Sequence, residues 1–288
     1  MREISGVGVA LVTPFDISGN VDYDGLSKLL VHTKCVDYWV VMGTTGESAT
    51  TTKDEKQQVL SYILKNNPDN KPIIYGIGGN NTHQVIEEIK GTDLTDVDAI
   101  LSVCPAYNKP TQNGMIAHFT AIADASPIPV LLYNVPGRTI VNLNASSTLK
   151  LAKHPNIMGI KEASNNLLQG TAIAHDKPND FKLISGDDML SVPLIAMGGC
   201  GLISVLANAY PNEFKEIIDS AKSGNFTSAA NIASKFLGLN TLMYEESNPV
   251  GVKHVLNKMG VCTNEVRLPM LSASNELQAK IEEEMTKI

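Results

Sequence analysis

The sequence has no cluster of basic residues, few cysteines and no long hydrophobic run, and each shortage excludes a class of protein. Its 23 Lys and Arg residues are scattered, and the formal net charge of −7 opposes binding to nucleic-acid phosphates. No segment approaches the ~20 apolar residues that span a membrane. The four cysteines form no C-x-x-C pair, so neither metal-ligand spacing nor a disulfide framework is expected. These shortages predict a globular protein of the reducing cytoplasm.

The apolar residues that are present fall into eight short runs. They occupy residues 6–15, 38–43, 72–78, 99–105, 129–136, 157–163, 182–188 and 201–206. Each run is apolar on both faces, which is typical of parallel strands covered by helices. Helical patterns lie between the runs; Thr52 and Glu55, for example, form a capping-box signature ahead of Val59, Leu60 and Ile63. Strand–helix alternation repeated eight times predicts a (β/α)8 barrel.

The rival architecture is a doubly wound open sheet. It requires a Gly-rich dinucleotide turn after the first strand, and the segment VTPFDISGN at 12–20 does not supply one. After about residue 224 the strands stop, and helical patterns follow at 226–246, 248–260 and 275–287. We therefore expect a catalytic barrel over residues 1–224 and a small C-terminal helical region over residues 225–288.

Polar residues gather where the predicted strands end, and these ends share one mouth in a barrel. The segments are GTTGES (43–48), PAYNKP (105–110), YNVPGRT (133–139), KEAS (161–164), SGDD (185–188) and ISV (203–205). Histidine is missing from every one of them. Histidine-based metal chemistry and a Ser-His triad are therefore excluded as first hypotheses.

Lys161 ends an apolar run, and two interpretations compete for it. A strand-end lysine is commonly a solvated surface residue. An ordinary lysine has a pKa of ~10.4, so roughly one in a few thousand is a free amine at pH 7. Burial disfavours the ammonium form and creates a nucleophile. Tyr133 ends the preceding strand at a similar depth, and an amine beside a phenol suits the making and breaking of a C=N bond.

The other strand ends carry weaker signals. The GTTGES turn is either an ordinary tight turn or a loop whose amides and hydroxyls hold a small carboxylate. Arg138 is either solvated or placed to bind a substrate carboxylate with its bidentate fork.

Taken together these motifs resemble the 4-hydroxy-tetrahydrodipicolinate synthase family of pyruvate-dependent Schiff-base aldolases. The segments that carry the resemblance, in chain order, are GTTGES, PAYNKP, YNVPGRT, GIKEAS, ISGDD, residues 201–211 and RLP at 267–269. The resemblance implies condensation of pyruvate with L-aspartate 4-semialdehyde, in the diaminopimelate route to lysine. It also implies a covalent Schiff base with no metal or cofactor, and a homotetramer built as a dimer of dimers.

The resemblance also implies residue roles. Lys161 forms the Schiff base with pyruvate, and Tyr133 acts as the acid/base. Thr44 and Tyr107 complete a proton relay, with Tyr107 reaching in from a neighbouring subunit. Thr45 binds the pyruvate carboxylate, and Arg138 binds the semialdehyde carboxylate. The backbones of Gly186 and Ile203 line the pocket.

The sequence departs from the family at a regulatory pocket that lysine-inhibited members carry at their tight-dimer interface. Ser48, Ala49 and Asn80 match the residues of those members. Lys53, Gln84 and Ala106 replace their His, Glu and Tyr, respectively. Lys56 replaces a His that is found in some of them. Losing an acid and adding positive charge disfavours a cationic ligand. We therefore expect weak or absent inhibition by lysine.

Two other readings remain. One is a sister Schiff-base enzyme, such as N-acetylneuraminate lyase or a keto-deoxy-sugar acid aldolase or dehydratase. Arg138 argues against it, because sugar-acid lyases generally lack an arginine there. The other is a non-enzymatic barrel that binds a keto acid, which has no need of a nucleophile and a proton relay. Pyruvate-dependent borohydride trapping separates enzyme from binder.

Overall fold

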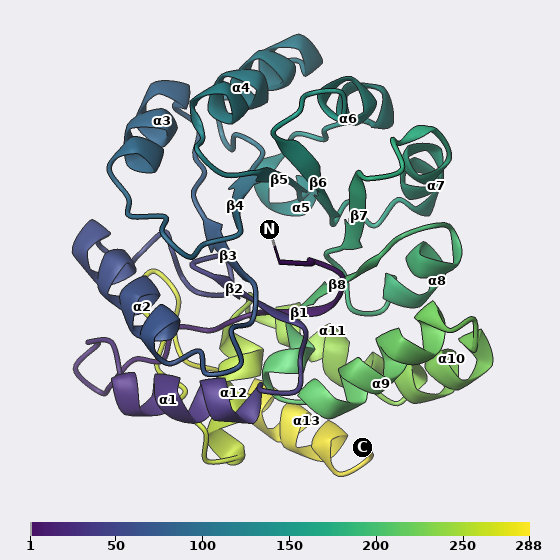
Figure 1. Cartoon of the computed structure of the whole chain (residues 1–288). Helices are drawn as coiled ribbons and strands as arrows, with labels where there is room; N and C mark the ends of the chain where they lie inside the picture. Colours follow the sequence, from purple (N-terminus) through teal and green to yellow (C-terminus); the bar gives the residue numbers. More distant parts are fainter. Residues whose placement is uncertain (1) are drawn as a thin grey trace.

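The computed structural model describes residues 2–288 and contains a closed barrel of eight parallel strands (Figure 1). Around the barrel they are β1 (Gly6–Ala10), β2 (Tyr38–Val41), β3 (Ile73–Gly76), β4 (Ala99–Val103), β5 (Val130–Asn134), β6 (Ile157–Glu162), β7 (Lys182–Ser185) and β8 (Gly201–Ser204). Pairing of β1 with β8 closes the sheet. The predicted (β/α)8 barrel is confirmed, and the open sheet is excluded.

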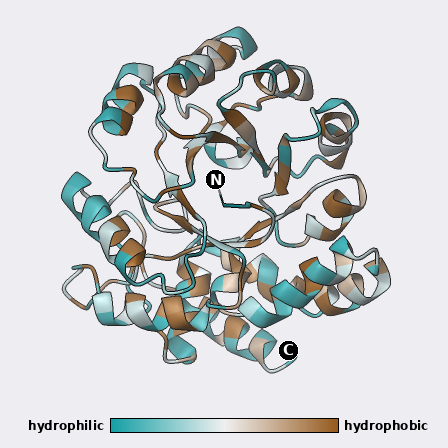
Figure 2. Ribbon diagram, in the orientation of Figure 1, coloured by the Kyte–Doolittle hydropathy of each residue, from teal (hydrophilic) through white to brown (hydrophobic). Residues whose placement is uncertain are grey.

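Helices cover the outside of the barrel, with their brown, apolar faces turned toward the strands (Figure 2). They are α1 (Tyr23–His32), α2 (Lys53–Lys65), α3 (Thr82–Lys90), α4 (Gln112–Ala125), α5 (Pro136–Thr139), α6 (Ala145–Leu151), α7 (Leu167–Asp176), α8 (Ser191–Ala196) and α9 (Pro211–Lys222), with a 3-10 turn η1 (Leu206–Asn208) after β8. The predicted capping box is present at the start of α2, where Thr52 and Glu55 cap each other, and α2 buries Val59, Leu60 and Ile63.

Side-chain alternation along the strands creates two cores. One fills the barrel and includes Tyr133 and Ile184; the other lies between the strands and the helices and includes Ile160. Lys161 pairs in register with Tyr133 on one side and Ile184 on the other, so it faces the barrel interior. Its neighbour Glu162 consequently faces the helices.

Every strand ends earlier than its apolar run. The first run continues to residue 15, whereas β1 ends at Ala10. Beyond the strand ends the backbone leaves the ladder to form the loops of the mouth, and several residues there adopt left-handed conformations, among them Met42, Tyr107 and Ile140. Apolar character persists because these loops are themselves packed.

The C-terminal helices gather at one side of the barrel (Figure 1) and are α10 (Phe226–Ser234), α11 (Leu237–Glu245), α12 (Val250–Lys258) and α13 (Asn275–Met285). The helical pattern expected over 226–246 is present as two helices, because the chain breaks between α10 and α11. Phe236 turns inward there; it is fully buried, with its ring centroid 5.1 Å from that of Tyr210 and 5.2 Å from that of Phe214. The domain boundary near residue 224 stays a prediction.

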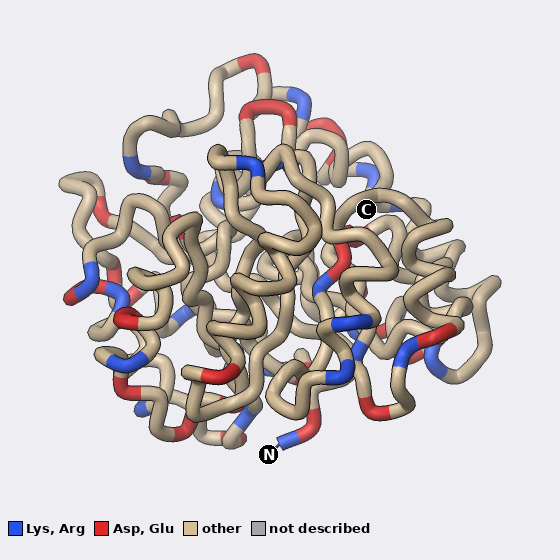
Figure 3. Tube along the Cα trace, turned by 90° about the horizontal axis from the view of Figure 1, so that it is seen from above, with Lys and Arg blue, Asp and Glu red and all other residues tan. Residues whose placement is uncertain are grey.

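Charged residues of both signs are interspersed along the chain (Figure 3). Over residues 2–288, none of the helices has the length and apolarity that crossing a membrane requires.

Candidate active site

Two adjacent strands place an amine beside a phenol. Tyr133 on β5 and Lys161 on β6 are register partners. Their exposed fractions are 6% and 5%, and the Lys161 Nζ lies 4.3 Å from the centroid of the Tyr133 ring. Lys161 is therefore a buried side chain of the barrel interior, and the interpretation as a solvated strand end is wrong.

A cavity of about 700 Å³ opens over this pair. Its lining includes Thr45, Tyr133, Arg138, Lys161 and Gly186, so five of the residues singled out in the sequence meet there. A Cβ at Gly186 would lie 2.9 Å from the Cε of Lys161. Glycine at this position therefore leaves the lysine side chain room to reach the cavity.

A second cavity, of about 560 Å³, adjoins the first. Thr44 lines it, and Tyr133 and Arg138 contribute to the walls of both cavities. Tyr133 thus lies where a proton could pass between the amine on one side and the Thr44 hydroxyl on the other.

Two of the expected site residues line neither cavity. Ile203 is fully buried in the barrel interior. Tyr107 is 88% exposed and left-handed, with φ of 73°. Its loop is nevertheless held, since the Nδ2 of Asn80 donates to the carbonyl of Ala106 at 3.1 Å and the Nδ2 of Asn108 donates to the carbonyl of Asn80 at 2.8 Å.

Some residues at the positions of the family's regulatory pocket line the second cavity, and the others lie outside it. Ser48, Ala49 and Lys56 line the second cavity, where the Nζ of Lys56 lies 3.5 Å from a carboxylate oxygen of Glu88. The others lie outside it: Lys53, Asn80 and Gln84 are exposed, and Ala106 is half-buried.

The mouth holds a second buried lysine, Lys253, that the sequence analysis did not single out. Its Nζ pairs with Oε1 of Glu47 at 2.5 Å, and both side chains are fully buried. Over residues 2–288, by contrast, Lys161 forms no ion pair with any carboxylate. The available sequence signal was a lysine inside the apolar run of residues 250–256.

The GTTGES turn that carries Thr44 and Thr45 is tightly hydrogen-bonded. The amide of Glu47 donates to the carbonyl of Thr44 at 3.0 Å, and the amide of Gly46 donates to that of Gly43 at 3.1 Å. The Nδ2 of Asn248 donates to the Thr45 hydroxyl at 2.9 Å. This organisation goes beyond that of an ordinary surface turn.

On the outer side of β6, Glu162 anchors the strand end next to Lys161. Its carboxylate accepts from the Nδ2 of Asn134 at 3.1 Å, from the Nε2 of Gln169 at 2.9 Å and from the amide of Ser164 at 2.7 Å. These hydrogen bonds hold the backbone next to Lys161 in place from the helix-facing side of β6.

Asp188 lies in the loop that follows β7 and holds this loop against the end of β8. Burial raises the pKa of its carboxyl to about 6, while hydrogen bonds from the Ser204 hydroxyl and the amides of Val205 and Leu206 oppose that rise. These contacts join the loop after β7 to the loop after β8.

No group of three or more His, Cys, Asp or Glu side chains suited to a metal ion occurs within residues 2–288.

Comparison with known proteins gives a consistent result over the whole length. The model of the dihydrodipicolinate synthetase family matches residues 3–288. A 4-hydroxy-tetrahydrodipicolinate synthase of Cytophaga hutchinsonii is 50% identical over 290 aligned residues, covering 100% of this chain and 98% of the relative. A dihydrodipicolinate synthase structure from Bacillus anthracis superposes with a TM-score of 0.95 at 36% identity, covering 100% and 99% of the two chains. A structure of the enzyme from Cyanidioschyzon merolae with lysine bound has a TM-score of 0.93 at 36% identity, covering 98% and 97%.

Proposed function

The chain belongs to the dihydrodipicolinate synthetase family, and on that premise we propose that it condenses pyruvate with L-aspartate 4-semialdehyde to give 4-hydroxy-tetrahydrodipicolinate, in the diaminopimelate route to lysine. The observation that carries the proposal is the environment of Lys161. It is a buried lysine without a carboxylate partner in residues 2–288, and it lies beside Tyr133 in a cavity that Thr45 and Arg138 also line.

The chemistry begins with the amine of Lys161. Its Nζ attacks C2 of pyruvate, the C2 oxygen leaves as water, and an iminium forms. Loss of a proton from C3 gives an enamine, whose C3 attacks the aldehyde carbon of the second substrate. The amino group of that substrate then attacks C2, closes the ring and releases Lys161. Each step needs a proton moved over a short distance, which the hydroxyls of Tyr133 and Thr44 supply.

Two residues bind the substrate carboxylates in this proposal. Thr45 holds that of pyruvate close to Lys161, and both residues line the same cavity. Arg138, exposed on α5 at the mouth, holds that of the semialdehyde. A guanidinium fork binds a carboxylate in a fixed orientation, so it presents the aldehyde to the enamine. Gly186 contributes to the wall of the same cavity, and Ile203 packs in the barrel interior beneath it.

We further propose that the reaction uses no cofactor and that the protein is a cytoplasmic homotetramer, built as a dimer of dimers. The Schiff base itself serves as the electron sink, so the chemistry requires no other group. Tyr107, Leu268 and Leu271 are 88%, 75% and 72% exposed, which supports an interface near the mouth. The four cysteines are free, as in a reducing compartment.

A coupled assay tests the reaction. Pyruvate and the semialdehyde are supplied with dihydrodipicolinate reductase, and NADPH consumption is followed for the wild type and for Lys161→Ala. We expect turnover by the wild type and none by the variant, with borohydride trapping of pyruvate lost in parallel. A folded wild type that traps pyruvate but does not turn over the semialdehyde would instead be a sister aldolase.

A further inference from the structure

Glu47 is a buried acidic residue in the turn that carries Thr44 and Thr45. Its side chain has no exposed surface. Its backbone is left-handed, with φ of 54°, a conformation that residues other than glycine rarely adopt. Its carbonyl accepts from the amide of Thr50 at 3.0 Å and from the hydroxyl of Thr51 at 2.8 Å. A strained conformation persists only where the surrounding contacts enforce it.

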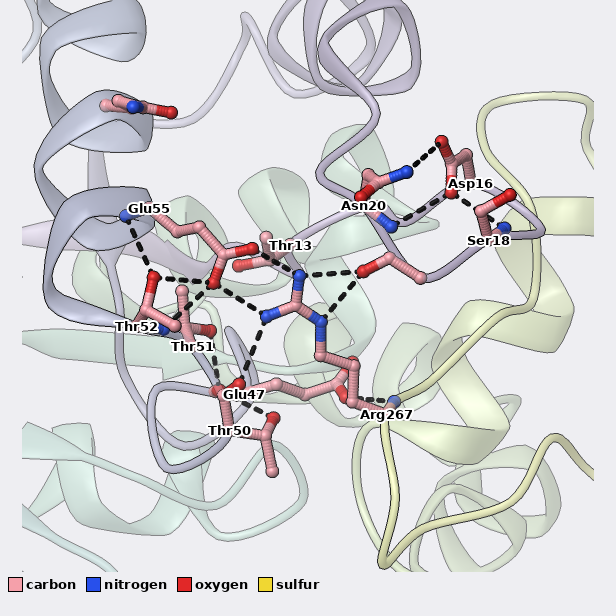
Figure 4. Close-up of polar contacts among 12 residues, drawn as sticks. Thr13, Asp16, Ser18, Asn20, Glu47, Thr50, Thr51, Thr52, Glu55 and Arg267 are labelled. Atoms are coloured by element: carbon pink, nitrogen blue, oxygen red, sulfur yellow. Dashed lines mark hydrogen bonds and ion pairs between the residues drawn. The ribbon is translucent and has the colours of Figure 1, made fainter.

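The C-terminal region supplies those contacts. Lys253 of α12 pairs with Oε1 of Glu47 at 2.5 Å, and the amide of Arg267 donates to Oε2 at 3.0 Å. Figure 4 shows Glu47 and Arg267 meeting between the first loops and the C-terminal segment. Both carboxylate oxygens are therefore held by residues far away in the sequence.

Lys253 is itself fixed in place. Its Nζ donates to the carbonyl of Glu265 at 2.7 Å and lies 4.2 Å from the centroid of the Phe15 ring. An ammonium ion with these partners cannot follow a moving loop. It is an anchor point for Glu47.

A second contact joins the same parts of the chain independently. Asn248, just before α12, donates from Nδ2 to the hydroxyl of Thr45 at 2.9 Å. The C-terminal region therefore contacts the turn at Glu47 and at Thr45, the residue proposed to bind the pyruvate carboxylate.

From these contacts we propose that Glu47 and Lys253 are positioning residues, which set the orientation of Thr44 and Thr45 toward pyruvate. The inference rests on the proposed function for the identity of the ligand. Displacing a binding group by 1 Å can cost about a hundredfold in rate, so the geometry of this turn controls catalysis. The C-terminal region accordingly positions the turn that carries Thr44 and Thr45.

The test removes both charges together, because removing one alone would leave a buried charge unpaired, whereas a hydrophobic pair of similar volume is often tolerated. In Glu47→Leu/Lys253→Met, we expect thermal unfolding close to that of the wild type. We expect the pyruvate concentration that half-saturates borohydride trapping on Lys161 to rise about tenfold, the effect of one lost hydrogen bond to a charged group. The KM for the semialdehyde should not change, since Arg138 lies on α5.

A raised half-saturating pyruvate concentration with an unchanged KM for the semialdehyde distinguishes a positioning role from a merely structural one. A lower folded fraction would reduce the amount of trapped pyruvate but leave the half-saturating concentration unchanged. Glu55→Gln is the matched control: it weakens the side-chain contact of Arg267, at 2.8 Å, without touching Glu47. The control should keep wild-type half-saturation.

An unchanged half-saturating concentration in the folded double variant overturns the inference. If that variant does not fold, Glu47→Gln/Lys253→Met keeps the acceptor for the Arg267 amide and is measured in the same way; a smaller rise is then expected, and no rise overturns the inference. A wild type that traps pyruvate without turnover contradicts the proposed reaction, and the trapping curves still decide the inference. A wild type that traps no pyruvate overturns both.

Discussion

Lys161 and Lys253 are both buried lysines at the mouth, and their surroundings give them different roles. Lys253 faces the Glu47 carboxylate, and the pair is neutral as a whole. Lys161 has a phenol ring and an open cavity beside it. An ionised carboxylate stabilises an ammonium ion and holds it in place. Lys161 has no carboxylate partner within residues 2–288, and it is therefore the lysine that we propose as the nucleophile.

Arg138 provides the prediction at this scale. In Arg138→Lys the positive charge stays but the bidentate fork is lost, so we expect the KM for the semialdehyde to rise about tenfold or more. Pyruvate trapping on Lys161 should keep its wild-type half-saturation. Steady-state kinetics with each substrate varied in turn measure both quantities. Equal changes in the two would mean that Arg138 does not discriminate between the substrates.

The proposed functional groups lie at the ends of strands and helices and not in their central residues. Strands β5 and β6 end at Asn134 and Glu162, whose side chains bond to each other on the outer face while Tyr133 and Lys161 point inward. Because successive side chains of a strand point to opposite faces of the sheet, one residue of each neighbouring pair stabilises the strand end while the other faces the barrel interior. Helix α2 likewise begins with a capping box close behind the GTTGES turn, which we propose to bind pyruvate.

Glu55, in that capping box, predicts a pH-dependent stability. A hydrogen bond from Arg267 lowers the pKa of its carboxyl from 4.5 to about 2. Because the folded-state pKa is depressed, the stabilisation is present above about pH 4.5 and is lost as the pH falls toward 2. Glu55→Gln should therefore lower stability by about 1–2 kcal/mol at pH 7 and have little effect near pH 2.

Thermal unfolding of the wild type and of Glu55→Gln across this pH range measures the difference. The gap in Tm should close as the pH falls. A gap that stays constant down to pH 2 would mean that the carboxylate charge contributes nothing.

For the whole molecule, the closed barrel brings together residues from strands far apart in the chain. Thr45 follows β2, Lys161 is the penultimate residue of β6 and Gly186 follows β7, yet all three line one cavity. Asn248 joins them from the C-terminal region, and Lys253 contacts Glu47 in the turn that carries Thr45. Tyr107 remains outside, since it is 88% exposed and lines neither cavity.

Mixed oligomers test whether Tyr107 acts on a neighbouring subunit. Lys161→Ala and Tyr107→Phe subunits are each expected to be inactive or strongly impaired alone. In a mixed dimer, the Tyr107→Phe subunit keeps its own Lys161 and receives an intact Tyr107 from its neighbour. Co-expression of differently tagged subunits, followed by the coupled assay, should therefore restore activity. Activity no greater than that of the separate variants would place Tyr107 in its own subunit's site or outside catalysis.

The regulatory pocket gives a second prediction at the molecular scale. Lys56 lines the cavity beside Ser48 and Ala49, where its Nζ lies 3.5 Å from a carboxylate oxygen of Glu88, and Gln84 supplies no carboxylate. Because Lys56 already pairs with Glu88, the ammonium groups of a diamino acid such as lysine gain little there, so we expect no inhibition by lysine at sub-millimolar concentration. The coupled assay with added L-lysine measures this. Gln84→Glu, which restores an acid, should increase sensitivity, and a sub-millimolar inhibition constant for the wild type would contradict the prediction.

The sequence by itself determined the barrel, because eight doubly apolar runs alternating with amphipathic segments pack as covered parallel strands. It also predicted which strand-end residues line the cavities at the mouth, with the exception of Tyr107 and Ile203, since side chains at those ends meet there. Only the tertiary structure decided that the segment 226–246 divides into two helices at residues 235 and 236, where the Phe236 ring packs against Tyr210 and Phe214. It alone paired Glu47 with Lys253, since no local pattern links residues so distant in the chain, and a buried charge finds its partner only when the chain has folded.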